Sequence, residues 1–325
     1  MSDPEHGSLS RREMLKRTAA TGVVAAGVVG AAAWFSRRPN WPYPEEKVAL
    51  RSFAAGGEGP AMCIAKGSDP GALAKAALEE LGGMSRFVTA GDVVLVKPNV
   101  AFDRPAWQGA TANPDVVGAI VAACKDAGAA EVLVTDNPIH APEGCFRKSG
   151  IGRAAEDAGG TVLLPRPDLF APVSLEGTLL DGWSVLVAPL LRATKVIGIA
   201  PVKDHNLALA SMTMKNWYGL LGGPRNRLHQ RMDETIATLA SLIRPTLSVL
   251  DGSTIMIRNG PTGGSVEDLV RGDVLAIGTD TVALDAFGAT LLGLGVEDLP
   301  YLRMAQDAGA GTWDFESLQP RRISG

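Results

Sequence analysis

Apolar residues along this chain fall into short continuous runs that alternate with helically spaced segments. Val93-Val94-Leu95-Val96 is a continuous run, which is typical of a strand buried on both faces. Asn113-Pro114 then combines an N-cap residue with proline at the first helical position, and the helical spacing of residues 116–127 ends at Gly128. Residues 131–135 form the next apolar run. This order predicts a strand–helix–strand unit with parallel strands.

The alternation continues through the rest of the chain. A helix is expected at 152–158 and a strand at 161–164. Further strands are expected at 184–187, 195–199, 247–250 and 274–277, and further helices at 232–243, 281–292 and 299–308. The glycines and prolines of 259–264 predict a loop. Strands alternating with helices predict an α/β fold with a largely parallel sheet flanked by helices, and a division into two lobes stays open.

The first 35 residues have the pattern of an export signal. Arg11-Arg12 lie in a polar segment, and an apolar run rich in Ala, Gly and Val follows from Thr18 to Phe35. This resembles a twin-arginine (Tat) signal, whose substrates cross the membrane folded. We therefore predict the Tat machinery as a partner, and the periplasm or the outer face of the cytoplasmic membrane as the location. Cleavage near Ala31-Ala32-Ala33 and retention as an anchor both stay open.

These patterns divide the chain into four parts. After the signal at 1–35, residues 36–47 are a Pro-rich linker. Residues 48–310 are expected to form the α/β domain, and 311–325 a tail.

Composition and charge exclude some classes of function. A hydrophobic content of 46% with 20% charged residues is that of an ordinary globular protein. The formal net charge of −4 and the aromatic content of 5% give no basis for binding nucleic acid.

The cysteines are few and widely separated. Cys63, Cys124 and Cys145 contain no C-x-x-C spacing, so neither a structural zinc site nor an iron–sulfur cluster is expected from this chain alone. Cys124 falls on the apolar face of an expected helix and is interpreted as a core residue. One disulfide stays open.

Polar residues follow several of the expected strands. They are Lys97 and Asn99, Asp136, Lys203 and His205, and Asp251. In α/β sheets, ligands bind beyond the carboxyl ends of the strands, so these residues could share one rim. A buried strand that ends in a lone lysine must place the ammonium in water or against an anion. The alternative is a set of solvated loop charges.

A second group of polar residues lies between residues 212 and 231. Lys215 and Asn216 stand among apolar and aromatic residues, and Arg225, His229 and further arginines follow. Such a set could bind a carboxylate or phosphate, although a basic helix face in solvent is the alternative. His205 and His229 could serve as a proton shuttle or as metal ligands.

Two aspartates border the expected helix at 281–292. Asp280 is interpreted as its N-cap, whereas Asp285 lies in an apolar segment and needs a partner, for which a nearby lysine is the obvious candidate. Asp251 and Asp285, with His205, are candidate ligands for a divalent metal, although no H-E-x-x-H motif supports this. Walker A, G-x-G-x-x-G and G-x-S-x-G motifs are absent from the sequence.

The order of these residues resembles the domain of unknown function 362 family over about residues 48 to 295. The matching positions are Lys97-Pro98-Asn99, Lys203-x-His205, Lys215-Asn216-x-x-Gly219, His229, Asp251-Gly252, Gly260-Pro261-x-x-Gly264 and Asp280-x-x-x-x-Asp285. The resemblance implies an α/β protein, and some members carry Tat leaders or fused iron–sulfur modules. No general activity follows from it. The chain departs from the pattern at Ile257 and Arg258, where relatives tend to carry an acidic residue.

Together these observations predict an exported protein that binds or transforms a small anionic ligand in a cleft lined by Lys and His. His205 and Lys215 are the expected catalytic residues. The expected ligand-binding residues are Lys97, Asn99, Lys203, Asn216 and His229. Two alternatives stay open. One is an accessory protein of an exported redox or iron–sulfur system, with a protein of that system as partner. The other is a metal-dependent hydrolase.

Overall fold

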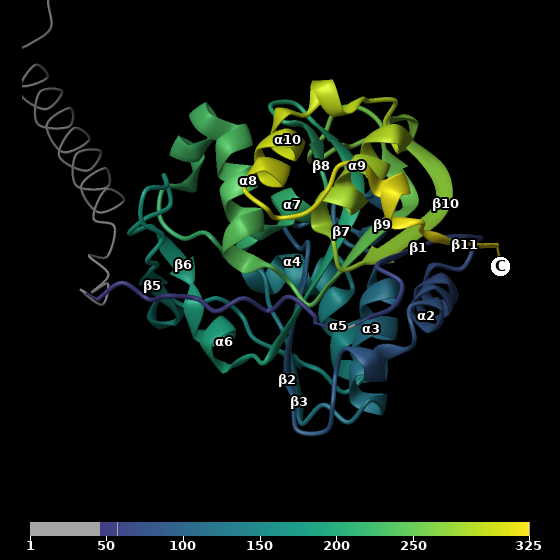
Figure 1. The fold of residues 1–325 in the computed structure, drawn as a ribbon, viewed down its shortest axis with the longest axis horizontal. Helices are drawn as coiled ribbons and strands as arrows, with labels where there is room; N and C mark the ends of the chain where they lie inside the picture. Colours follow the sequence, from purple (N-terminus) through teal and green to yellow (C-terminus); the bar gives the residue numbers. More distant parts are fainter. Residues whose placement is uncertain (1–45, 57, 325) are drawn as a thin grey trace, which may run out of the picture. The chain divides into compact units, whose positions relative to one another are not determined.

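A nine-stranded mixed sheet forms the centre of the described chain, which comprises residues 46–56 and 58–324 of a computed structural model (Figure 1). The predicted signal and all but the end of the predicted linker lie outside these residues. Along the sheet the order is β11 (Arg321–Ser324), β1 (Met62–Lys66), β10 (Leu269–Gly278), β9 (Leu247–Met256), β7 (Lys195–His205), β2 (Val93–Pro98), β3 (Glu131–Val134) and β4 (Thr161–Val162), and β8 (Leu209–Ser211) pairs with β7. Strands β9, β7, β2, β3 and β4 are parallel, whereas β10 is antiparallel to both of its neighbours.

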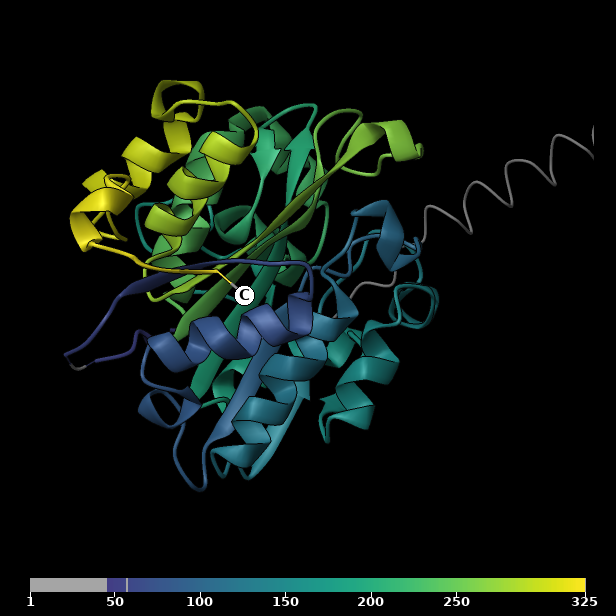
Figure 2. The ribbon, with the colours of Figure 1, turned by 90° about the vertical axis from the view of Figure 1, so that its right-hand side faces the viewer.

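Helices cover both faces of this sheet, as Figures 1 and 2 show. One apolar core lies under α2 (Pro70–Glu80), α3 (Pro114–Asp126), α4 (Pro142–Lys148) and α5 (Ile151–Asp157). The other lies under α6 (Val187–Arg192), α7 (Thr213–Asn216), α8 (Met232–Ile243), α9 (Thr281–Leu291) and α10 (Pro300–Asp307). Neighbouring residues of β2 alternate between the cores, because successive side chains of a strand point to opposite faces. The predicted α/β fold with a largely parallel sheet is therefore confirmed.

The strand–helix–strand unit forms as its sequence predicts. Strand β2 pairs in parallel with β3, and α3 connects them. The Asn113 side chain accepts a hydrogen bond of 2.9 Å from the Asp115 backbone N–H, with Pro114 at the first helical position. Helix α8 has the expected bounds, α9 ends one residue early, and α5 and α10 differ from the expected bounds by one residue at each end.

Several expected strands have different lengths or partners. Strand β7 extends to His205 and β9 to Met256, so Lys203, His205 and Asp251 lie within strands instead of after them. The polar residues did not end these strands because their side chains find partners inside the fold. The strand expected at 184–187 is β6 (Ser184–Leu186), which pairs with β5 (Phe170–Pro172) in a separate two-stranded sheet.

The remaining differences concern the ends of the domain. Residues 311–325, expected to be a tail, contain β11, which pairs in parallel with β1 at the edge of the sheet. The described residues form one compact unit around one main sheet. The sequence had not decided between one unit and two lobes. All three cysteines are buried and free. Within the described ranges, the helices are too short or too polar to cross a membrane.

Candidate functional site

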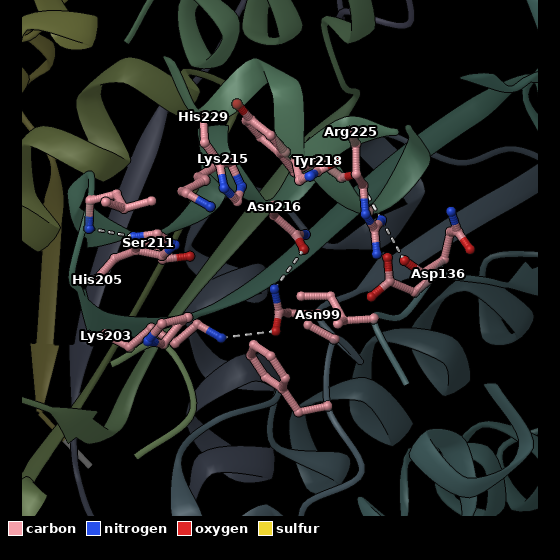
Figure 3. A pocket seen from close by; sticks show the side chains of 18 of the residues that line it. Asn99, Asp136, Lys203, His205, Ser211, Lys215, Asn216, Tyr218, Arg225 and His229 are labelled. Atoms are coloured by element: carbon pink, nitrogen blue, oxygen red, sulfur yellow. Dashed lines mark hydrogen bonds between the residues drawn. The ribbon is translucent and has the colours of Figure 1, made fainter. Parts of the chain in front are cut away.

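A cavity of about 550 Å³ opens at the carboxyl ends of β2, β3 and β7 (Figure 3). Parallel strands bring their carboxyl ends to one edge, so residues far apart in the sequence meet there. The strands and the residues following them supply Asn99, Asp136, Lys203 and His205. The other wall comes from α7 and the 3₁₀ helices Trp217–Leu220 and Arg225–Arg231, which supply Lys215, Asn216, Tyr218, Gly219, Arg225 and His229. Apolar residues of the lining are Ala101, Phe102, Ile139, Leu207 and Pro261.

Lys97 and Asp136 form a buried ion pair at the base of the cavity, where Asp136 belongs to the lining and Lys97 lies behind it. The Nζ of Lys97 lies 2.7 Å from Oδ1 of Asp136, and both side chains are at most 1% exposed. Burial lowers the pKa of Lys97, and the Asp136 carboxylate opposes this effect. The second carboxylate oxygen of Asp136 accepts a hydrogen bond of 2.7 Å from the Val100 backbone N–H. The charge of Lys97 is thus neutralised within the protein.

Asn216 ties α7 to the strands. Its Oδ1 accepts a hydrogen bond of 2.7 Å from Lys97 Nζ, and its Nδ2 donates to the backbone carbonyls of Lys97 and Ile199 at 3.1 and 3.2 Å. Asn99 donates a longer bond of 3.4 Å to the same Oδ1. Asn216 is therefore held by β2 and β7, which fixes the position of its neighbour Lys215.

Lys203 is buried in β7 with its amino group satisfied by neutral acceptors. Its Nζ donates to Oδ1 of Asn99 at 3.2 Å and to the Ala110 carbonyl at 2.7 Å, and it lies 5.3 Å from the ring centroid of Phe102. Burial is the main cause that lowers its pKa to about 7, and the charges of Lys215 and Lys97 add to this.

Lys215 is the least restrained of the three lysines. Its Nζ lies 4.6 Å from the ring centroid of Tyr218, in cation–π range, and no hydrogen-bond acceptor from residues 46–56 or 58–324 reaches it. Burial, with a contribution from Arg225, lowers its pKa to about 8. The Tyr218 hydroxyl donates to the Leu228 carbonyl at 3.5 Å.

His205 is held in one tautomer by its own turn. Its Nδ1 accepts hydrogen bonds from the backbone N–H groups of Leu207 and Ala208 at 3.1 and 3.2 Å, which assigns the proton to Nε2. Burial first, and then the charges of Lys215 and Lys203, lower the pKa of His205 to about 3. At neutral pH it is an uncharged hydrogen-bond donor.

His229 and Arg225 complete the polar lining. The ring of His229 lies 6.1 Å from that of Tyr218, and partial burial and the Lys215 charge lower its pKa. Arg225 donates to the carbonyls of Asn137 and Pro138 at 2.7 and 2.9 Å. These bonds join the 3₁₀ helix to the loop after β3 and place a guanidinium at the cavity.

Asp285 acts on the site from α9. Its carboxylate accepts hydrogen bonds from the Thr213 hydroxyl and from the backbone N–H groups of Thr213 and Met214, the latter two at 2.7 and 3.1 Å. These N–H groups begin α7, so Asp285 caps the helix that carries Lys215. Burial raises the pKa of Asp285 to about 7 despite these bonds. The partner of Asp285 is therefore the start of α7 and not the lysine that the sequence had suggested.

Asp251 lies within β9, away from the cavity lining. Its Oδ1 accepts from the Ser253 backbone N–H and hydroxyl at 3.0 and 2.6 Å, and its Oδ2 accepts from the Asn113 N–H at 3.3 Å. Donors thus occupy the oxygens of Asp251, as they do those of Asp285, and neither aspartate fits a metal-ligand set with His205. In the described part of the chain, His, Cys, Asp and Glu form no group of three or more that could hold a metal ion.

Of the predicted ligand-binding and catalytic residues, the structure places six in the cavity lining: Asn99, Lys203, His205, Lys215, Asn216 and His229. Lys97 lies beneath them and orders the others. Tyr218 and Arg225 also line the cavity. The sequence placed both only within the 212–231 group that could bind an anion, and neither was among the expected catalytic or ligand-binding residues. The aromatic and basic content of the 212–231 segment was their only signal. No sequence signal indicated the apolar wall of Phe102, Ile139 and Leu207, because single apolar residues in loops are common.

The fold and this cavity define a mixed α/β protein with a cationic pocket at the carboxyl edge of its parallel strands. A family model for a domain of unknown function, DUF362, matches residues 94–290, which contain all of the site residues described above. The chain belongs to this family.

Comparison with known proteins adds three similarities. The chain is 28% identical over 265 residues to a thylakoid-associated protein of Synechocystis, with 76% of this chain and 78% of the relative covered. A solved structure from Thermotoga maritima is 14% identical with a TM-score of 0.38, covering 70% of this chain. The lactate racemase apoprotein of Thermoanaerobacterium thermosaccharolyticum is 13% identical with a TM-score of 0.40, covering 77% of this chain. The chain spans 60% of the length of each of these two structures.

Proposed function

We propose that this protein binds a small anionic ligand in the cavity, through Lys203, Lys215 and Arg225. The observation that carries the proposal is the charge of the cavity. Of the described side chains that line it, Asp136 alone is acidic, and Lys97 neutralises Asp136 from below. Three further cations share the space with no carboxylate of their own.

The lowered pKa values of Lys203 and Lys215 have the same origin. Each ammonium is desolvated, and each is close enough to another cation to be disfavoured by it. A carboxylate or phosphate in the cavity would compensate both effects by direct charge-assisted hydrogen bonds. The ligand would therefore raise both pKa values and bind together with protons.

Neutral donors supply the remaining recognition. With Nδ1 occupied by backbone N–H groups, His205 offers its Nε2–H to an oxygen of the ligand. The Asn99 amide lines the same space. Such donors orient an anion, whereas Phe102, Ile139 and Leu207 would contact an apolar part of the ligand.

Calorimetry with a panel of small carboxylates and phosphates tests this proposal. The purified full chain is expected to bind at least one of them, and Lys215→Ala and His205→Ala are expected to abolish binding while the melting temperature stays close to that of the wild type. Lys75→Ala, at an exposed position of α2, is the matched control and should bind as the wild type does. Unchanged binding in both cavity variants would refute the proposal.

The same calorimetry also measures whether protons bind together with the ligand. Because the bound anion raises the lysine pKa values, affinity should fall as the pH rises from 7 to 9, and the heat of binding should depend on the ionisation enthalpy of the buffer. Binding without proton uptake would mean that these lysines do not hold the anion.

We also propose that the protein reaches the cell envelope through the Tat machinery. The support is the Arg11-Arg12 pair and the apolar run that follows it. Replacing both arginines by lysine should retain the chain in the cytoplasm, as fractionation and immunoblotting would show. Export of that variant at the wild-type level would refute the proposal.

A further inference from the structure

The three lysines of the site differ in what their amino groups contact. Lys97 forms an ion pair with Asp136, and Lys203 donates to an amide oxygen and a backbone carbonyl. Lys215 lies in the same cavity with its Nζ over the Tyr218 ring, and residues 46–56 and 58–324 give it no hydrogen-bond acceptor. Its amino group is therefore available to react with a ligand.

The backbone that carries Lys215 is rigidly held. Asp285 caps the start of α7, and Asn216, the next residue, is fixed by β2 and β7. The amine is thus presented to the cavity from a fixed position, as reaction with a bound carbonyl group requires.

The surroundings of Lys215 also favour its neutral form. In the unliganded cavity, a pKa of about 8 in place of 10.5 raises the fraction of neutral, nucleophilic amine at pH 7 by roughly 300-fold relative to a solvated lysine. Desolvation and a nearby cation are the two features that activate lysine nucleophiles.

We propose that Lys215 forms an imine with the carbonyl carbon of an anionic oxo compound, such as a 2-oxo acid. The inference rests on the proposed function, because the same cavity must first bind the anionic group. Lys203 and Arg225 would hold that group, and the wall of Phe102, Ile139 and Leu207 favours an apolar substituent on the other side.

The step balances without a further reagent. The Nζ lone pair of neutral Lys215 forms the C–N bond while the electron pair of the carbonyl π bond moves to oxygen, which takes a proton from nitrogen. The resulting hydroxyl accepts a second proton and leaves as water. This proton balances the one that the Lys215 ammonium lost to become neutral, so no net proton is consumed. A protonated imine remains. Solvent supplies that second proton, and the Nε2–H of His205 can hydrogen-bond the carbonyl oxygen.

Reduction with borohydride tests the proposal, because hydride converts an imine into a stable secondary amine. The full chain is incubated with pyruvate or phenylpyruvate, reduced and analysed by intact mass and peptide mapping. Lys215 should carry the adduct at least about tenfold more than any other lysine. Phenylpyruvate should react more completely than pyruvate because its ring can contact the apolar wall.

Two variants separate the chemistry from binding. Lys215→Arg keeps a cation and cannot form the imine, so it should lose the adduct and bind phenylpyruvate more tightly than Lys215→Met does. Lys215→Met, which removes the amine at similar length, should also lose the adduct. Their melting temperatures check that both are folded.

The outcomes distinguish this proposal from the one on which it rests. An adduct at Lys203 or spread over surface lysines overturns the imine at Lys215. If an oxo acid binds without forming an adduct, or if only other anions bind, the imine proposal is refuted and the anion-binding proposal stands. If neither oxo acid nor any member of the anion panel binds, both proposals fail.

Discussion

The Nζ of Lys97 lies 2.7 Å from Oδ1 of Asp136, and neither side chain reaches solvent. Lys97 lies in β2, and Asp136 follows two residues after the end of β3, the parallel neighbour of β2. Lys97 also donates to Asn216, so this ion pair joins the sheet to the helix that carries Lys215. The pair therefore links stability of the fold to the geometry of the site.

Removing one partner of this pair should destabilise the protein strongly. Asp136→Asn leaves the Lys97 ammonium buried without a counter-ion, which costs about 3 to 5 kcal/mol. Urea denaturation measures the loss. The double variant Lys97→Met/Asp136→Asn should lose less than the sum of the single variants, because no uncompensated charge remains. Additive losses would contradict this account. Asp157→Asn in the exposed pair with Arg153 is the control and should leave the midpoint unchanged.

Gly219 allows the chain to pass directly over the ion pair. A Cβ atom at this position would overlap Oδ1 of Asp136 and lie 2.6 Å from Lys97 Nζ. Gly219→Ala should therefore destabilise the protein by about 1 to 3 kcal/mol, through overpacking, and weaken anion binding. Gly264→Ala, where a Cβ meets no atom within 4 Å, is the matched control in urea denaturation. Equal midpoints for the two variants would show that Gly219 is not sterically required.

The cap that Asp285 provides should be needed for both stability and binding. Asp285→Ala leaves the buried backbone N–H groups of Thr213 and Met214 without that acceptor, and the Thr213 hydroxyl keeps only its 3.3 Å bond to the Thr281 carbonyl. This should cost at least about 1 to 3 kcal/mol. Binding should also weaken, because α7 carries Lys215. Thr290→Ala, at an exposed position of the same helix, controls for general effects on α9. If Asp285→Ala binds the anion as the wild type does at temperatures where it is folded, Asp285 contributes to stability and not to binding.

The unliganded protein should show a pH dependence of stability that depends on Lys215. Its pKa is about 8 when folded and near 10.5 when unfolded, so between these values the unfolded chain binds more protons. Its contribution to stability therefore rises with pH over this window, by up to about 1.4 kcal/mol per pH unit. Comparing urea midpoints at pH 8 and pH 10 should show a smaller rise, or a larger fall, in Lys215→Met than in the wild type. Lys75→Met should behave as the wild type does, and identical profiles for all three proteins would contradict the prediction.

Local patterns determined much of the fold. The continuous apolar run at Val93–Val96, the Asn113-Pro114 helix start and the spacing of 232–243 each report burial of neighbouring residues, and all three became the expected elements. The composite pattern of polar residues also indicated the family, which the match over residues 94–290 shows. Strand length was harder to predict. Lys203 and Asp251 interrupt the apolar runs, yet each finds its partners only in the folded chain.

Sequence alone thus determined the α/β class, the order of the main elements from β2 to α10 and most of the residues at the carboxyl edge, because these depend on periodicity and on the parallel direction of the strands. Tertiary structure decided what each charge does. It paired Lys97 with Asp136, satisfied Lys203 with neutral acceptors, directed Asp285 to the start of α7 and placed Lys215 over Tyr218. The physical reason is that the role of a buried charge depends on the few ångströms around it, and those neighbours come from distant parts of the chain.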